Sequence, residues 1–218
     1  MDLYITQNSY YFVHRYFIKF FLRENTHIIY VRESKRGLFK KYYEIILNFG
    51  FFNTIYCSFF ELFYFLVFFK DQGKLSSKVV DDFNLNDILE KRIGTGNYSR
   101  VFSIGCPSMI NADLQKQFSI NIYNLHGGIV PFQKGRFSPI KSLKNGHEYL
   151  GASLYLISDT FDDGHVISQN YFKVYNKNII SNYNNVLSIS AHLLESFFNG
   201  DNKKIPVNVF KSLGKADL

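Results

Sequence analysis

The chain has 218 residues, which suits one large domain or two small ones, and its 46% hydrophobic and 20% charged residues indicate a globular protein. The two cysteines, Cys57 and Cys106, exclude a disulfide framework, and no cysteine or histidine spacing indicates a zinc site. The formal net charge of +7 favours a polyanionic partner: nucleotide phosphates, a polyglutamate tail, RNA or an anionic membrane. The densest basic cluster, Arg32–Lys41, fits a solvated surface and a binding patch equally well. The first residues lack the basic-apolar-small order of a signal peptide, so a cytoplasmic location is expected.

Apolar runs separated by turn residues predict alternating strands and helices. The expected strands are Leu3–Thr6, His27–Val31, Ser77–Val80, Val101–Ile104 and Ile120–Asn124. The expected helices are about Tyr10–Arg23, a long helix or helix pair that ends near Phe69, and Asp87–Ile93 with Asn86 as its N-cap. Strands that alternate with helices at this rhythm indicate an α/β fold with a Rossmann-like, mostly parallel sheet flanked by helices. No Gly-x-Gly-x-x-Gly motif follows the first strand, so dinucleotide binding has no support.

The segment Ile45–Phe69 is almost entirely apolar and long enough to cross a bilayer, with Glu61 as its only charge. Its polar residues recur at steps of three or four, which places them along one side of a helix. A carboxylate that faces lipid at mid-span would cost about 2–3 kcal/mol or more, whereas this polar side can face water or a cleft. We therefore expect a long helix with most of its circumference buried against a sheet or a partner subunit. Transmembrane insertion is the alternative, and peripheral membrane association is compatible with both.

The stretch from Ile122 to Val174 holds the residues with the clearest chemical use. Asn124 and His126 lie two apart at the end of a predicted strand, so their side chains should project to the same side. Such strand ends line the ligand crevice of open α/β sheets. The turn Phe161–Gly164 adds carboxylates, and an amide, an imidazole and a carboxylate together can stabilise an oxyanion and move a proton. On spacing alone, a strand-end asparagine, a half-buried histidine and a simple turn explain the pattern more economically.

The wider set of motifs resembles a known family. After Asn124-Leu125-His126 come Val130-Pro131, Lys134-Gly135-Arg136, Pro139, Gly146, Gly151 and Asp162-Asp163-Gly164. This order resembles the N10-formyltetrahydrofolate-dependent formyltransferases, which include glycinamide ribonucleotide transformylase, methionyl-tRNA formyltransferase and the nucleotide-sugar N-formyltransferases. Asp162 follows His126 by 36 residues, as the family motif requires. The resemblance covers a third of the chain and implies the formyltransferase fold, N10-formyltetrahydrofolate as co-substrate and no metal.

The resemblance also implies roles for individual residues. The catalytic residues would be Asn124, His126 and Asp162, and Asp162 is preferred to Asp163 because it is the first residue of Asp-x-Gly. Two loops resemble the folate pocket of the family: Ser103, Ile104, Gly105, Cys106 and Met109, followed by Ile157, Ser158, Thr160 and Phe161. Lys134 and Arg136 would bind the substrate, and simple solvation of these two cations is an equal alternative. Gly127 and Gly128 stand where the family has small polar residues, a departure that would reshape the acceptor pocket.

The domain organisation and the acceptor are expectations drawn from the two ends of the chain. We expect a catalytic core over 1–175 and a short C-terminal extension over 176–218, packed on the core or at a homodimer interface. This extension is too short for the further domain of a methionyl-tRNA formyltransferase. Thr6–Ser9 lacks the glycine of the phosphate-binding turn that follows the first strand in purine-pathway enzymes.

A nucleotide-linked amino-dideoxy sugar, with dTDP as the nucleotide, is therefore the favoured acceptor, in the synthesis of a surface polysaccharide such as O-antigen. The alternatives are phosphoribosylglycinamide in purine synthesis, and a non-catalytic or membrane-associated member of a polysaccharide locus. Neither nucleic acid nor an integral membrane contact is expected. The resemblance leaves open whether His126 or Asp162 takes the first proton.

Overall fold

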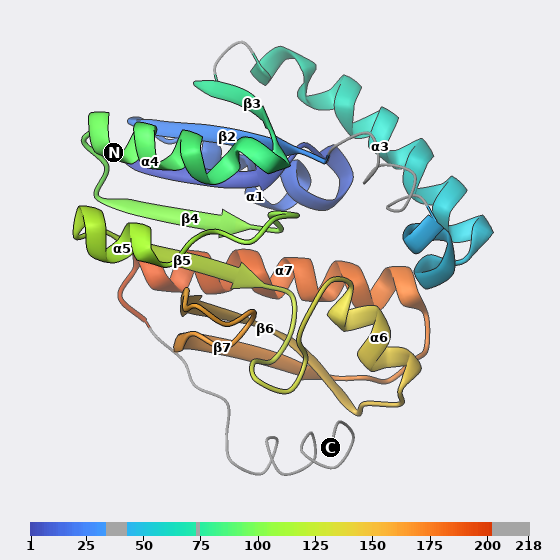
Figure 1. Ribbon diagram of the computed structural model, residues 1–218. Coiled ribbons are helices and arrows are strands. Elements are labelled where there is room, and N and C mark those ends of the chain that lie inside the picture. The colour runs from blue at the N-terminus through green and yellow to red at the C-terminus, as the bar shows by residue number, and fades with distance from the viewer. Residues whose placement is uncertain (34–42, 73–74, 202–218) are drawn as a thin grey trace. The chain divides into compact units, whose positions relative to one another are not determined.

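The computed structural model describes residues 1–33, 43–72 and 75–201, and its strands form a seven-stranded, mostly parallel sheet flanked by helices (Figure 1). The strand order is β3-β2-β1-β4-β5-β6-β7, which confirms the predicted α/β fold class. The chain divides into two compact units, and the division lies between Tyr123 and Asn124. This point falls inside strand β5 (Asn121–His126), so β5 contributes residues to both units.

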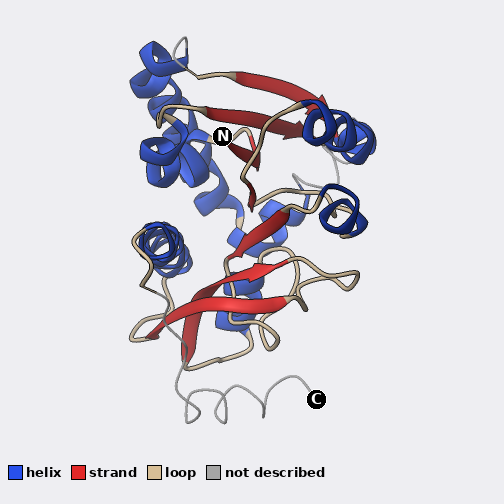
Figure 2. Ribbon diagram, turned by 90° about the vertical axis from the view of Figure 1, so that its left-hand side faces the viewer, coloured by secondary structure: helices blue, strands red, loops and turns tan. Residues whose placement is uncertain are grey.

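The first unit is built on four strands: β1 (Asp2–Gln7), β2 (Thr26–Arg32), β3 (Ser77–Asp81) and β4 (Arg100–Ile104). They are parallel, and β1 is hydrogen-bonded to β2 on one side and to β4 on the other. Leu3, Tyr4 and Ile5 are completely buried, as expected for a central parallel strand that is covered on both faces. Figure 2 shows helices on both faces of these strands. The four strands predicted in this part of the sequence are confirmed to within one residue at each end.

The helices of the first unit depart more from the prediction. They are η1 (Tyr10–His14, a π-helix), α1 (Arg15–Phe21), residues 43–49, α3 (Phe51–Gln72), η2 (Asp82–Asn84), α4 (Leu85–Thr95) and α5 (Asp113–Phe118).

The prediction that Asn86 is an N-cap is wrong, because α4 already begins at Leu85. The Asn86 side chain instead holds the loop after β4: its Nδ2 donates to the carbonyl of Met109 at 3.3 Å, and its Oδ1 accepts from the backbone N–H of Asn111 at 2.9 Å.

Helix α3 is exposed along one whole side, so the rest of this chain does not bury it, and burial against a partner subunit stays a prediction. The helix packs on η1 through Tyr11, whose ring contacts the rings of Tyr56, Phe60 and Tyr64. Because η1 has only five residues, it covers one side of α3, and nine large apolar side chains of the helix remain exposed. Within the described ranges, 51–68 is the one helical segment that is long and apolar enough to cross a membrane. Most of the basic cluster predicted between residues 32 and 41 lies outside the described residues.

The second unit contains the end of β5 and the elements α6 (Ser138–Lys144), β6 (Tyr149–Leu156), β7 (His165–Lys173) and α7 (Ile179–Phe198). Strands β6 and β7 are antiparallel, and α7 packs on both of them and on α6. Leu143, Leu150 and Val186 form a buried cluster among these elements. Helix α7 begins at Ile179, where the Asn178 side chain accepts a hydrogen bond from the backbone N–H of Ser181 and caps the helix. Residues 202–218 lie outside the described part of the chain, and the predicted division at residue 175 stays a prediction.

Candidate active site

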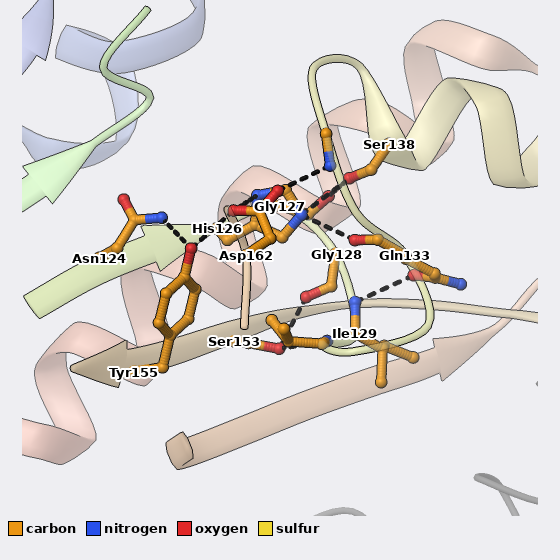
Figure 3. A network of polar contacts seen from close by, with 12 residues as sticks. Asn124, His126, Gly127, Gly128, Ile129, Gln133, Ser138, Ser153, Tyr155 and Asp162 are labelled. Carbon is orange, nitrogen blue, oxygen red and sulfur yellow. Dashed lines mark hydrogen bonds and ion pairs between the residues drawn. The ribbon is translucent and has the colours of Figure 1, made fainter. Parts of the chain in front are cut away.

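His126, the last residue of β5, has both ring nitrogens next to polar partners (Figure 3). Nε2 lies 2.8 Å from the carbonyl oxygen of Gln133 and 3.2 Å from Oγ of Ser138. A carbonyl oxygen only accepts hydrogen bonds, so Nε2 carries the hydrogen in the neutral ring, and the proton-accepting nitrogen is Nδ1. Nδ1 lies 3.6 Å from Oδ1 of Asp162, and the two side chains are only 12% and 2% exposed. His126 can therefore take up a proton at Nδ1, beside a carboxylate that stabilises the resulting cation.

Asp162 reaches this position through an unusual backbone conformation. Its φ of 49° is left-handed, a region that aspartate tolerates better than most residues. Oδ2 accepts a hydrogen bond from the backbone N–H of Gly135 at 2.6 Å, and Oδ1 accepts one from the hydroxyl of Tyr155 at 2.6 Å. Gly164 completes the turn, because a Cβ atom there would lie 1.7 Å from the carbonyl oxygen of Leu156. The Asp-x-Gly spacing is thus a geometric requirement for a turn that folds back onto β6.

Asp163, the neighbouring carboxylate, faces a different partner. Its Oδ1 lies 3.1 Å from Nζ of Lys134, and both side chains are close to half exposed. The structure therefore brings Asp162, and not Asp163, to the imidazole of His126.

Tyr155 was missed in the sequence analysis, and it links the three predicted catalytic residues. Its hydroxyl donates to Oδ1 of Asp162 and accepts a hydrogen bond from Nδ2 of Asn124 at 2.5 Å, as Figure 3 shows. Burial, together with the charge of Asp162, raises the pKa of the Tyr155 phenol well above its usual range, so the hydroxyl keeps its hydrogen. The signal that could have found it is the period of two in a strand: Ser153 and Tyr155 lie on the same face of β6, on the strand that leads into the Asp-x-Gly turn.

Asn124 and His126 thus meet the same carboxylate by different routes. His126 approaches Asp162 directly, whereas Asn124 reaches it through the Tyr155 hydroxyl. The structure brings the three predicted residues into one network of polar contacts inside the second unit. Within the described ranges, no three histidine, cysteine or acidic side chains lie close enough together to hold a metal ion.

Gly128 is required by the close approach of the loop that follows β5. A Cβ atom at this position would lie 2.3 Å from the carbonyl oxygen of Gln133 and 2.6 Å from Nε2 of His126. The Gln133 side chain closes the loop, since its Oε1 accepts from the N–H of Ile129 at 3.1 Å and its Nε2 donates to the carbonyl of Tyr149 at 2.8 Å. The space that the missing side chain leaves at Gly128 is therefore filled by the protein's own atoms, including the ring of His126.

We expect Gly128→Ala to lower the rate of formyl transfer by about tenfold or more, because the new methyl group displaces His126 from Asp162. Overpacking of this kind also costs about 1–3 kcal/mol of unfolding free energy, which thermal or denaturant unfolding measures. Gly127→Ala is the matched control, since its Cβ would meet only Val186 and Pro139 at 3.3 and 3.6 Å. Equal effects of the two substitutions would show that the approach to His126 is not the reason for Gly128.

The predicted folate residues of the first loop lie at the end of β4, in the first unit. Ser103 and Ile104 are the last residues of the strand and are buried, and Gly105 follows with a φ of 58°. Cys106 donates its thiol hydrogen to the carbonyl of Ser108, and burial raises the pKa of this thiol to about 12. A thiol with so high a pKa stays protonated and is a poor nucleophile. Met109 is exposed, and its role in folate binding stays a prediction.

The second predicted folate loop lies in the second unit and connects β6 to Asp162. Ser158 donates its hydroxyl hydrogen to the carbonyl of Thr160 at 3.1 Å, which folds the loop into a turn after Ile157. Phe161, directly before Asp162, is exposed. The roles of these four residues in folate binding stay predictions as well.

The two cations proposed to bind substrate differ in their surroundings. Lys134 forms the ion pair with Asp163 described above, and Thr160 lies 3.5 Å from the other oxygen of the same carboxylate. Arg136 is half-buried, and its guanidinium lies 5.2 Å from the centroid of the Phe137 ring. Lys134 is thus partly neutralised by a neighbouring carboxylate, and Arg136 contacts an aromatic ring.

Comparison with known proteins places this network inside a recognised domain. Residues 99–194 match the family model of the formyl transferases, and this range holds every residue of the polar network. No curated protein is similar enough to match the chain. The phosphoribosylglycinamide formyltransferase of Campylobacter jejuni is 16% identical over 91% of this chain and 96% of that chain, with a TM-score of 0.60.

Two further formyltransferases of known structure are also similar to this chain. A 4-N formyltransferase from Francisella tularensis is 15% identical over 94% of this chain and 72% of that chain, with a TM-score of 0.57. WlaRD, a sugar 3N-formyl transferase solved in the presence of dTDP and 5-N-formyl-THF, is 16% identical over 94% of this chain and 65% of that chain, with a TM-score of 0.56.

At these identities, the solved structures establish the fold, and the family model establishes the type of domain. Together with the fold, the match defines an enzyme of folate-dependent formyl transfer. The chain carries a formyl transferase domain over residues 99–194.

Proposed function

We propose that the protein transfers the formyl group of N10-formyltetrahydrofolate to the amine of a nucleotide-linked amino-dideoxy sugar, with dTDP as the nucleotide. The observation that carries this proposal is the polar network in which His126 meets Asp162 and Asn124 meets Tyr155. The reaction would take place in the cytoplasm and serve the synthesis of a surface polysaccharide such as O-antigen. A homodimer stays part of the proposal and is tested by analytical ultracentrifugation.

The network suits the proton and charge movements of this reaction. The amine nitrogen forms a bond to the formyl carbon, the bond from that carbon to N10 breaks, and one proton moves from the amine to N10. The pair His126–Asp162 takes up the proton of the attacking amine and returns it to the leaving nitrogen. Nδ2 of Asn124 carries two hydrogens, and Tyr155 receives one of them. The second can donate to the formyl oxygen, where negative charge develops during attack.

The acceptor is argued from the turn after β1, in the first unit. In the purine-pathway enzymes that the sequence resembles, this turn is rich in glycine and serine and binds the phosphate of the acceptor. Here the carboxylate of Glu61 accepts hydrogen bonds from Oγ of Ser9 and from the backbone N–H of Tyr11, both at 3.0 Å. These are the groups that a phosphate would need, and a second anion beside Glu61 would be repelled. This contact supports an acceptor other than phosphoribosylglycinamide.

The decisive test offers the enzyme both kinds of acceptor. Nucleotide-linked amino sugars and phosphoribosylglycinamide are each incubated with N10-formyltetrahydrofolate, tetrahydrofolate release is followed, and the product is identified by its mass. We expect turnover with a dTDP-linked amino sugar and none with phosphoribosylglycinamide. Turnover of phosphoribosylglycinamide alone would overturn the proposed acceptor while leaving the chemistry of the network in place.

We expect Arg136→Ala to raise KM for the nucleotide sugar far more than it lowers kcat. A contact to a phosphate is similar in the ground state and the transition state, so its loss weakens binding and leaves the chemical step almost unchanged. The expected loss is about 1.5–3 kcal/mol for a charge-assisted hydrogen bond, or roughly 10- to 100-fold in KM. Lys134→Ala is the matched comparison and should have a smaller effect, because Asp163 already pairs with Lys134. If calorimetry on Arg136→Ala showed that folate binding is lost and nucleotide-sugar binding is kept, Arg136 would be a folate-binding residue and this assignment would be wrong.

A further inference from the structure

The exposed side of α3 is a surface that formyl transfer does not explain. Nine apolar side chains of this helix are between 45% and 84% exposed: Phe51, Phe52, Ile55, Tyr56, Phe59, Leu62, Phe63, Leu66 and Val67. We call these residues the α3 apolar face. With about 100° of turn per residue, they cover a continuous arc of about 160° around the helix. Aromatic side chains present ~150–250 Å² each, so this face exceeds the ~300–600 Å² of the largest apolar patch on a typical monomer.

The polar groups of α3 are turned away from this face or bonded within the helix. Glu61, the only charged residue of 51–69, directs its carboxylate to Ser9 and the backbone of Tyr11 on the opposite side. Ser58 is the one exposed polar residue between the apolar positions, and its hydroxyl donates to the carbonyl of Thr54 at 2.9 Å. Apart from the hydroxyl of Tyr56 at the edge of the face, the polar side chains named here are bonded within the protein and can lie against hydrocarbon without being left unsatisfied.

The protein that carries this helix is basic. Arg15 is exposed, and its guanidinium lies 5.3 Å from the centroid of the Tyr64 ring, on the side of α3 that η1 covers. The whole chain carries a net charge of +7. An apolar helix face on a cationic protein is suited to the surface of an anionic bilayer.

We propose that the α3 apolar face binds the surface of an anionic phospholipid membrane, with the helix lying in the plane of the interface. Spanning is not proposed, since Tyr11 of η1 covers Phe60 and Tyr64 on the opposite side of α3. Tyr11 reaches the α3 apolar face only at its edge, where it contacts Tyr56. A second copy of the chain is the other possible occupant. Paired helices usually carry charged residues beside an apolar seam of narrower width, and these charges fix the register. The α3 apolar face carries no charge over its whole arc, which favours lipid.

A tryptophan placed on the face reports directly on its surroundings, because the chain contains no other tryptophan. Full-length Phe59→Trp is mixed with phosphatidylcholine vesicles that contain about 30% phosphatidylglycerol as the anionic lipid. We expect its emission to shift to the blue and to be quenched by brominated lipid. Phe83→Trp is the control: Phe83 is also exposed but lies in η2, and its emission should not change.

Sedimentation with the same vesicles measures binding of the unlabelled chain. We expect the triple variant Phe52→Gln, Phe59→Gln, Leu66→Gln to bind the vesicles at least about tenfold more weakly than the wild type. The control variant, Val79→Gln with Phe83→Gln, should bind as the wild type does. All five replaced side chains are exposed, so folding is preserved and is checked by thermal unfolding and by formyl transfer in solution.

Three outcomes would overturn the proposal. The wild-type chain would stay in the supernatant with vesicles, or it would bind phosphatidylcholine vesicles without anionic lipid equally well. Alternatively, Phe59→Trp emission would already be blue-shifted without vesicles and would depend on protein concentration, which would identify a second copy as the occupant. None of these results bears on the proposed acceptor, because the acceptor is tested in solution.

Discussion

Asp162→Asn is expected to lower kcat of formyl transfer by about 10²-fold or more, with a much smaller effect on KM. The substitution keeps the shape of the side chain but removes the negative charge that faces Nδ1 of His126. Without that charge, the protonated imidazole formed during the reaction loses its stabilising partner. His126→Ala and Asn124→Ala, which remove the other two predicted catalytic groups, should lower kcat by a similar factor. Release of tetrahydrofolate under saturating acceptor measures the effect.

Asp163→Asn is the matched control for this prediction. Asp163 is the adjacent carboxylate, and it faces Lys134 at the surface rather than His126. Its loss should change kcat only slightly, because exposed ion pairs contribute about 0–1 kcal/mol. If Asp163→Asn were inactive and Asp162→Asn normal, the assignment of the Asp-x-Gly motif would be one residue out of register.

Tyr155→Phe is expected to lower kcat by roughly 10- to 100-fold while leaving both KM values close to those of the wild type. The substitution removes one hydroxyl group and with it two hydrogen bonds, to Asp162 and from Asn124. A hydrogen bond to a charged group contributes about 1.5–3 kcal/mol, which corresponds to this range of rates. We regard Tyr155 as a positioning residue, because its argued effect is to hold Asp162 and Asn124 and not to touch the substrate.

The split between kcat and KM distinguishes positioning from a general loss of structure, because a misfolded site would also bind both substrates more weakly. Tyr149→Phe, on the same strand, is the control and should keep both kcat and KM. A normal kcat in Tyr155→Phe would show that Asn124 and Asp162 hold their positions without the hydroxyl.

The strands and the catalytic motif could be predicted from the sequence because they depend on neighbours along the chain. Short apolar runs between turn residues located β1 to β4, and the spacing of two placed Asn124 and His126 on one face of β5. The Asp-x-Gly motif was equally local, since the left-handed φ of Asp162 and the close approach at Gly164 belong to a single turn.

The remaining features were decided by contacts between residues far apart in the sequence. Asn86 was predicted as a cap but bonds to a loop more than twenty positions away, and Glu61 meets Ser9 across a separation of 52. The preference of a residue for a position within one helical turn contributes less stability than the tertiary packing that fixes such contacts. Sequence patterns that span only one turn could therefore not predict these contacts. The exposure of α3 has the same origin: the periodicity of its residues was visible in the sequence, but only the small size of η1 determined which side of the helix stayed uncovered. Sequence determined which residues could react, and tertiary packing determined which of them meet.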